Sequence, residues 1–103
     1  MTLALARAEV ESGAVRDALA NALIAQELFS RNSQPEFEWQ AWCIAGQANK
    51  HLGISNASDE QLVRASQLLS TLRQNWGERE FNTYMSRSDL KPLHNSIKEA
   101  VRN

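Results

Sequence analysis

The chain has 103 residues, of which 43% are hydrophobic and 22% charged, a balance that excludes global disorder and fits one small domain. Its formal net charge of -1 gives no overall basic field that would favour nucleic acid or a membrane surface as partner. One cysteine cannot form an internal disulfide, and with only two histidines the usual zinc ligand sets are excluded. We therefore expect a cytoplasmic protein without a cofactor or a metal.

The first half of the chain predicts three helices and no strand. Strong helix formers fill the intervals between the few prolines and glycines, and no stretch alternates in polarity as a strand does. Gly13 and Gly53 follow the first and third helices, where glycine suits the left-handed position after a helix end. The expected ranges are residues 2–12, 14–31 and 36–52.

The second half predicts three further helices, which makes about six in an all-α domain. Ser58 and Gln61 have the spacing of a capping box, so we expect the fourth helix to begin at Ser58. A short helix should follow Gly77 over "EREFNTYMSR", and a last helix should begin near Ser88 or Asp89. The apolar positions of the fourth and last helices are Leu62, Ala65, Leu68, Leu69, Leu72, Leu93, Ile97 and Val101.

The chain also resembles itself at an offset of 40 positions, which relates Gly13 to Gly53. In both copies a helix ends at this glycine and a longer helix with an apolar stripe follows. Such a helical hairpin buries its apolar face only against another hairpin and is the unit of an α-solenoid. The same offset also relates Ala8 to Ala48, Ala25 to Ala65, Leu28 to Leu68, and Ser30 to Ser70.

The second copy resembles a tetratricopeptide repeat. Trp42, Ala45, Gly46 and Gly53 are similar to the first-helix set of that family. Its second-helix set is represented by Leu62 and Ala65, while the degenerate first copy carries Ala6, Gly13, Ala18 and Ala25. Three features depart from the family pattern. Asn49 stands where an aromatic residue is usual, and the period is longer than about 34 residues. The small residue that usually opens the second helix is displaced to Ala57 or replaced by Ser58.

The resemblance implies one domain over residues 1–103, built as a right-handed superhelix of α-hairpins, and it fits a piece of a larger protein. Its parts would be a degenerate repeat at 2–32, a second repeat at 36–74 and capping helices at 76–103. Gly46 would let the other helix of the hairpin approach closely, with Ala65 as its small counterpart. Trp39 and Trp42 are three positions apart, which predicts that both pack against neighbouring helices.

The reactive residue types do not predict an enzyme. Cys43 and His51 are eight residues apart on one expected helix, or about 12 Å along its axis, so they cannot form a nucleophile–base pair. His94 could approach them only through tertiary folding. The carboxylates near helix starts are explained by the helix dipole.

The family resemblance implies a protein-interaction or scaffolding module with a concave groove lined by first helices. An extended or helical segment of another protein would bind there. The alternative is a compact helical regulatory or nucleic-acid-binding domain, in which the offset is accidental. The residues expected to face a partner are Arg7, Glu11, Gln40, Cys43, Gln47, Lys50 and His51, with Leu3 and Val10 beside them.

The first helix is also expected to carry a dimer contact. Two hairpins are fewer than the three or so repeats that usually make a solenoid stable, so an apolar edge should remain. A homodimer through this helix, or further repeats, would cover it. The edge consists of Leu3, Leu5, Ala6 and Val10.

Overall fold

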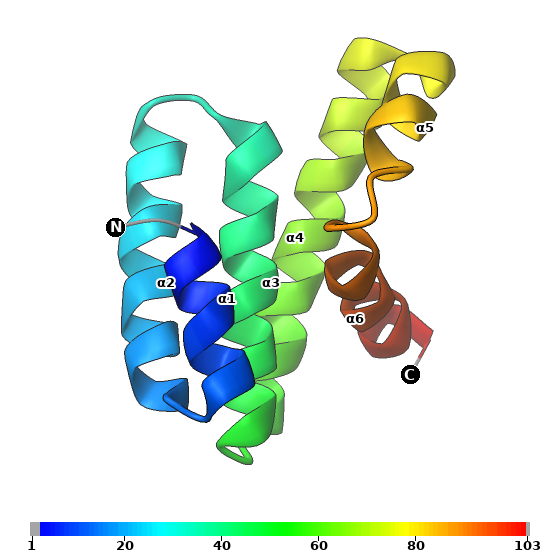
Figure 1. The fold of residues 1–103 in the computed structure, drawn as a ribbon. Helices are drawn as coiled ribbons and strands as arrows, with labels where there is room; N and C mark the ends of the chain where they lie inside the picture. Colours follow the sequence, from blue (N-terminus) through cyan, green and yellow to red (C-terminus); the bar gives the residue numbers. More distant parts are fainter. Residues whose placement is uncertain (1–2, 103) are drawn as a thin grey trace.

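The computed structural model describes residues 3–102, with their side chains except at positions 4, 5, 11, 12, 101 and 102. This part of the chain contains six helices and no strand (Figure 1), which confirms the all-α fold and the expected number of helices. The helices are α1 (Leu3–Ser12), α2 (Val15–Arg31), α3 (Pro35–His51), α4 (Ser55–Trp76), α5 (Glu78–Met85) and α6 (Lys91–Arg102).

Two antiparallel hairpins form most of the molecule. Helices α1 and α2 form the first hairpin and α3 and α4 form the second, and α2 packs along α3 between them (Figure 1). Helix α1 also contacts α3, while α6 returns across α3 and α4. Helix α3 is therefore surrounded by α1, α2, α4 and α6, and ten of its residues are buried.

The 40-residue offset also relates helix boundaries and buried positions. Helix α2 begins at Val15 and α4 at Ser55, and the glycines before them have φ angles of 91° and 79°. Only glycine adopts such angles at low cost, which explains why both hairpins turn at this residue type. The residues buried in α2 are Ala18, Ala22 and Ala25, and the residues 40 positions later are also buried: Ser58, Leu62 and Ala65.

A side-chain hydrogen bond occupies the same place in both hairpins. Asn21 on α2 donates its amide to the Glu9 carboxylate on α1. Asn49 on α3 donates to the amide oxygen of Gln61 on α4. Glu9 and Asn49 are 40 positions apart, and so are Asn21 and Gln61. The two hairpins therefore share their register as well as their order of helices.

The predicted start of α4 was wrong by one helical turn. The helix begins at Ser55, after Ile54 as N-cap, and no side chain caps it. Ser58 lies inside the helix, where its buried hydroxyl donates to the backbone oxygen of Gly46 at 2.7 Å. The Ser58 hydroxyl therefore joins α4 to α3, and the capping box does not form.

The close approach expected at Gly46 is confirmed, but its counterpart is different. A Cβ atom on Gly46 would lie 2.7 Å from Leu62 Cγ and 3.3 Å from the Ser58 backbone oxygen. Ala65 lies a turn further along α4 and is buried elsewhere in the core. The antiparallel direction of the hairpin explains the shift, since Gly46 near the end of α3 meets the first part of α4.

Helix α6 begins later than expected, at Lys91 instead of Ser88 or Asp89. Arg87 and Asp89 pair with each other, with their closest atoms 2.7 Å apart, and the Leu90 N–H bonds the Arg87 backbone oxygen in a turn. Pro92 lies in the first turn of the helix, where its missing N–H costs nothing.

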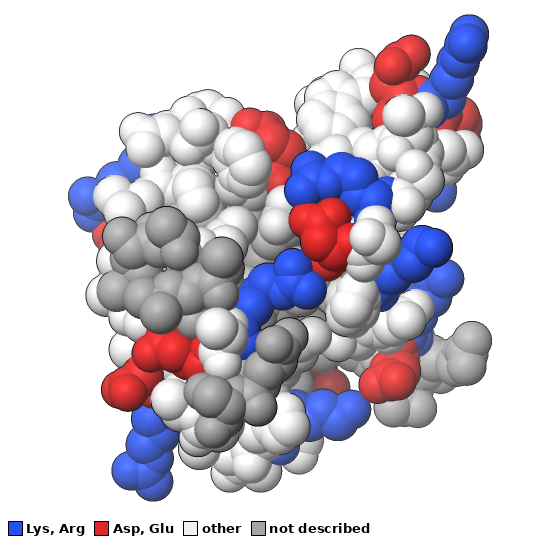
Figure 2. Space-filling model, in the orientation of Figure 1, with Lys and Arg blue, Asp and Glu red and all other residues white. Residues whose placement is uncertain are grey.

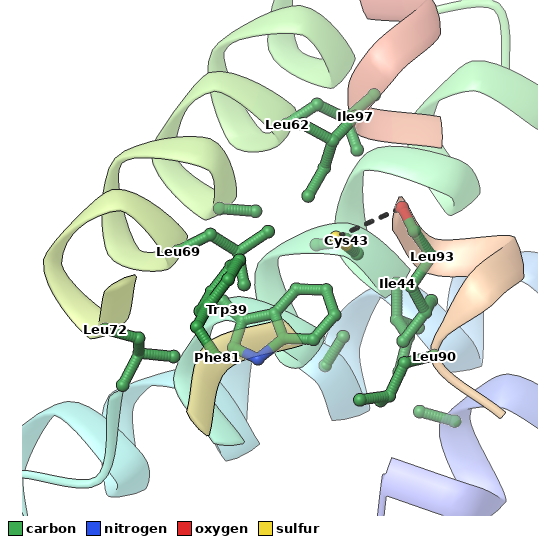
Figure 3. Close-up of a cluster of buried hydrophobic side chains, with 14 residues drawn as sticks. Trp39, Cys43, Ile44, Leu62, Leu69, Leu72, Phe81, Leu90, Leu93 and Ile97 are labelled. Atoms are coloured by element: carbon green, nitrogen blue, oxygen red, sulfur yellow. Dashed lines mark hydrogen bonds between the residues drawn. The ribbon is translucent and has the colours of Figure 1, made fainter. Parts of the chain in front are cut away.

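The core lies where α3, α4, α5 and α6 meet (Figure 3). Trp39 is fully buried there, and its indole N–H donates to the Tyr84 hydroxyl at 3.0 Å. Trp42 is only half-buried, and its indole donates to the Glu38 carboxylate at 3.0 Å. The two tryptophans both pack against other helices, as expected, but only Trp39 belongs to the centre of the core.

A candidate binding cleft between α1, α3 and α6

A cleft of about 750 Å³ lies between α1, the end of α3 and the start of α6. Four of the residues expected to face a partner line it, which is why we take it as the candidate site. The lining residues are Arg7 and Val10 from α1, Gln47, Lys50 and His51 from α3, and Pro92, Leu93 and Ser96 from α6.

Helix α3 places its three residues on one side by helical spacing. Lys50 and His51 lie three and four positions after Gln47, so both are neighbours of Gln47 on the surface of the helix near its end. A cation in the last turn also opposes the negative end of the helix dipole, which helps to hold Lys50 there. Arg7 adds a second basic group from α1.

Helix α6 closes the cleft through polar contacts with α3. The Gln47 amide donates to the Ser96 hydroxyl at 2.9 Å, and this hydroxyl donates to the Pro92 backbone oxygen at 3.2 Å. Lys50 and Glu99 form an ion pair at 3.3 Å in which both side chains are mostly exposed. Exposed pairs of this kind contribute little, about 0 to 1 kcal/mol, so a ligand can compete for Lys50 at low cost.

The described lining carries basic groups and no acidic one. Figure 2 shows lysine and arginine side chains along the seam between the first hairpin and the α5–α6 segment, with an acidic group among them. The hydrogen-bonded Arg87, and more weakly Arg7, hold the pKa of the Asp89 carboxyl below its usual value. Arg87 makes the direct contact with the Asp89 carboxylate.

A smaller hollow of about 340 Å³ lies on the other side of Lys50 and Ser96. Asp59 and Glu99 are among its lining residues, so its charge is mixed. The Lys50 side chain lines both hollows, and Glu99, its ion-pair partner, lines only the smaller one.

Two of the expected partner-facing residues are buried, which corrects their assignment. Cys43 has no exposed surface, its thiol faces the Leu93 backbone oxygen at 3.7 Å (Figure 3), and burial raises its pKa. Gln40 is 7% exposed and donates to the Tyr84 hydroxyl at 3.1 Å. The cause is tertiary packing, because α5 and α6 cover the face of α3 that we expected to be open to a partner.

The remaining expected residues have mixed outcomes. The Glu11 side chain lies outside the described residues. Leu3 packs against the core and does not line the cleft, whereas Val10 does both. The sequence did not predict that Pro92, Leu93 and Ser96 line the cleft. The only local signal was a proline and a serine four positions apart at the start of an amphipathic helix. Their position beside α1 and α3 could not be predicted, since it depends on how α6 packs against α3 and α4.

Within residues 3–102 no group of three or more histidine, cysteine, aspartate and glutamate side chains is arranged to hold a metal ion. No described helix combines the length and hydropathy that a bilayer-spanning segment needs. No family model, curated protein or solved structure shows a significant match to this chain. The assignment of function therefore depends on the geometry of the chain itself.

Proposed function

We propose that the domain is a non-catalytic protein-interaction module of tetratricopeptide-like type. The duplicated hairpin supports this proposal, because the two copies repeat their turn glycine, their buried positions and one interhelical hydrogen bond at the same offset. In such an array the first helices share one concave side. Here α1 and α3 are first helices, α6 lies next to α3 in the position of a third, and all three line the cleft.

The observation that carries the proposal is the combination of basic and apolar groups in that cleft. Arg7, Lys50 and His51 offer donors for carboxylates, while Val10 and Leu93 offer apolar contact. A peptide segment that carries acidic and apolar side chains fits both properties. Nucleic acid fits less well, because phosphate backbones need many cations and the chain has a net charge of -1.

Selection from a displayed library of random short peptides, followed by fluorescence anisotropy with the enriched sequences, tests the function. We expect enrichment of aspartate or glutamate beside apolar residues. Arg7→Gln and Lys50→Gln should each weaken the enriched peptides by a factor on the order of ten, with a smaller effect at high salt. The matched control is Arg79→Gln, which removes the same charge from exposed α5 and should leave affinity unchanged.

Two results would oppose the proposal. Peptides that bind equally well to the wild type, to Arg7→Gln and to Lys50→Gln would show that the cleft is not the site. Binding of a mixed-sequence single-stranded oligonucleotide more tightly than any selected peptide would favour the alternative, a nucleic-acid-binding domain. Circular dichroism of each variant separates loss of binding from loss of fold.

A further inference from the structure

The outward face of α2 is apolar, and nothing in the described chain packs on it. Leu23, Ile24 and Leu28 are 38%, 51% and 49% exposed, so this one helix carries several of the large exposed apolar side chains of the protein. Helix α2 forms an outer edge of the molecule beside α1 and α3 (Figure 1). It contributes no residue to the cleft, so this surface is independent of the proposed binding site.

The exposed stripe of α2 is symmetric about its middle residue. Ala20 and Leu28 lie four positions before and after Ile24, and Asp17 and Arg31 lie seven positions before and after it. Steps of four and seven return to the same face of an α-helix, and all five residues are exposed. The stripe therefore runs from an acidic group through small and large apolar groups to a basic group.

We propose that two copies of this chain associate through these stripes as an antiparallel, two-fold symmetric dimer. In that arrangement Ile24 of each copy meets Ile24 of the other, and the small Ala20 faces the large Leu28. Asp17 faces Arg31 of the second copy at both ends of the contact. Such an isologous contact needs one self-complementary surface, which this stripe supplies.

Charge selects the antiparallel direction. A parallel pair of α2 helices would place Asp17 against Asp17 and Arg31 against Arg31, whereas the antiparallel pair makes two opposite-charge contacts. Arg31 already pairs with Glu27 on its own helix, and both groups are mostly exposed. Asp17 of the second copy would join this pair, so the contact does not require that an existing pair be broken.

The dimer should be weak. A 17-residue helix is about 25 Å long, and one helix pair of that length buries less than the roughly 1,200 Å² typical of stable complexes. We therefore expect association only at high concentrations of the chain, as in weak transient complexes. The domain would then be monomeric in dilute solution and dimeric where its local concentration is high.

Cross-linking at the symmetry axis tests the geometry. Ile24→Cys places two thiols opposite each other in the dimer, and Cys43 does not interfere because it is buried. Under mild oxidation we expect mostly disulfide-linked dimer on a non-reducing gel. The matched control is Val63→Cys on α4, a position with 42% exposure, which should cross-link several-fold less. Equal cross-linking of the two variants would overturn the proposal.

Sedimentation equilibrium at concentrations up to several hundred micromolar tests the proposed contact between Asp17 of one copy and Arg31 of the other. Asp17→Arg and Arg31→Asp should each weaken association several-fold, and the double variant should restore it because the charges are exchanged. A wild-type chain that stays monomeric throughout, or a double variant no stronger than the single ones, would overturn the proposal. Neither result bears on the cleft, since peptide binding should be the same in all these variants.

Discussion

The contact at Gly46 determines how closely α3 and α4 can pack. A hydrogen in place of a side chain lets Leu62 and the Ser58 backbone approach, and the Ser58 hydroxyl then bonds the Gly46 backbone oxygen. Glycine inside a helix costs about 1 kcal/mol relative to alanine, so the residue is retained at the expense of helix propensity. We expect the close packing that it allows to outweigh that cost.

Gly46→Ala should therefore destabilise the domain although it favours helix formation. The new Cβ would lie 2.7 Å from Leu62 Cγ, and relieving that clash should cost about 1 to 3 kcal/mol, against a gain of about 1 kcal/mol. Urea unfolding followed by circular dichroism measures the difference. Ser70→Ala, at an exposed position of α4, is the control and should be neutral or slightly stabilising. A more stable Gly46→Ala protein would contradict the close approach.

At the scale of the element, α5 depends on its tertiary contacts. Eight residues are too few for a stable isolated helix. Phe81 is buried, and the Tyr84 ring packs edge-on against Trp39 and Trp76. The Tyr84 hydroxyl donates to the Glu36 backbone oxygen at 2.8 Å and accepts the Trp39 indole N–H, so it ties α5 to the start of α3.

Tyr84→Phe should weaken this attachment by about 1 to 3 kcal/mol, because it leaves the buried Trp39 N–H without its partner. Urea unfolding gives the size of the effect, and hydrogen exchange should show it first in α5. Thr83→Val removes an exposed hydroxyl from the same helix and should change stability by less than about 0.5 kcal/mol. Equal effects of the two variants would mean that the Tyr84 hydrogen bonds contribute nothing to docking.

At the scale of the whole molecule, α3 connects every part of the described fold. It packs against α1, α2, α4 and α6, and its Cys43 is enclosed where α6 crosses it. Because α3 packs against both helices of the first hairpin as well as against α4, the two hairpins should unfold as one cooperative unit. The thiol of Cys43 should become reactive only when that unit opens.

The buried thiol also predicts a loss of stability at alkaline pH. Burial raises the pKa of Cys43 in the folded state, whereas an exposed thiol in the unfolded chain has a pKa of about 8.5. Above about pH 8.5 the unfolded state therefore binds fewer protons, and the free energy of unfolding should fall by up to about 1.4 kcal/mol per pH unit. Burial likewise raises the pKa of Tyr84, which adds to the loss above about pH 10.

Urea unfolding between pH 7 and 10 measures this dependence, with Cys43→Ala as comparison. The variant is expected to be less stable at neutral pH but to lose less stability as the pH rises. Parallel pH profiles for the two proteins would contradict the enclosed position of Cys43. Fast reaction of the native thiol with a coloured disulfide reagent would contradict it as well.

The sequence predicted most of the elements because their signals are local. Gly13 and Gly53 end helices by their own conformational freedom, and both have the positive φ that this role requires. Ser58 shows the limit of such reasoning, since a capping-box spacing is also compatible with a serine whose hydroxyl bonds another helix. Only the position of α3 distinguishes the two.

Some residues of the candidate site could likewise be predicted from the sequence, and others could not. Arg7, Lys50 and His51 were expected on a shared surface, and they line one cleft because α1 and α3 end side by side. Gln40 and Cys43 lie on the same helix but are covered by α5 and α6. The expected N-terminal apolar edge is also partly covered, since Ala6 is buried and Leu3 and Val10 pack inward. The Leu5 side chain lies outside the described residues. The exposed apolar stripe lies on α2 instead.

The sequence by itself determined the all-α class, the approximate helix boundaries and the 40-residue register, because helix propensity, turn glycines and apolar periodicity act over a few residues. Only the tertiary structure decided which faces remain open. Where α5 and α6 return against α3 depends on packing between residues some 50 positions apart, such as Cys43 and Leu93. That packing buries one expected binding surface, forms the basic cleft beside it and leaves the outer stripe of α2 exposed.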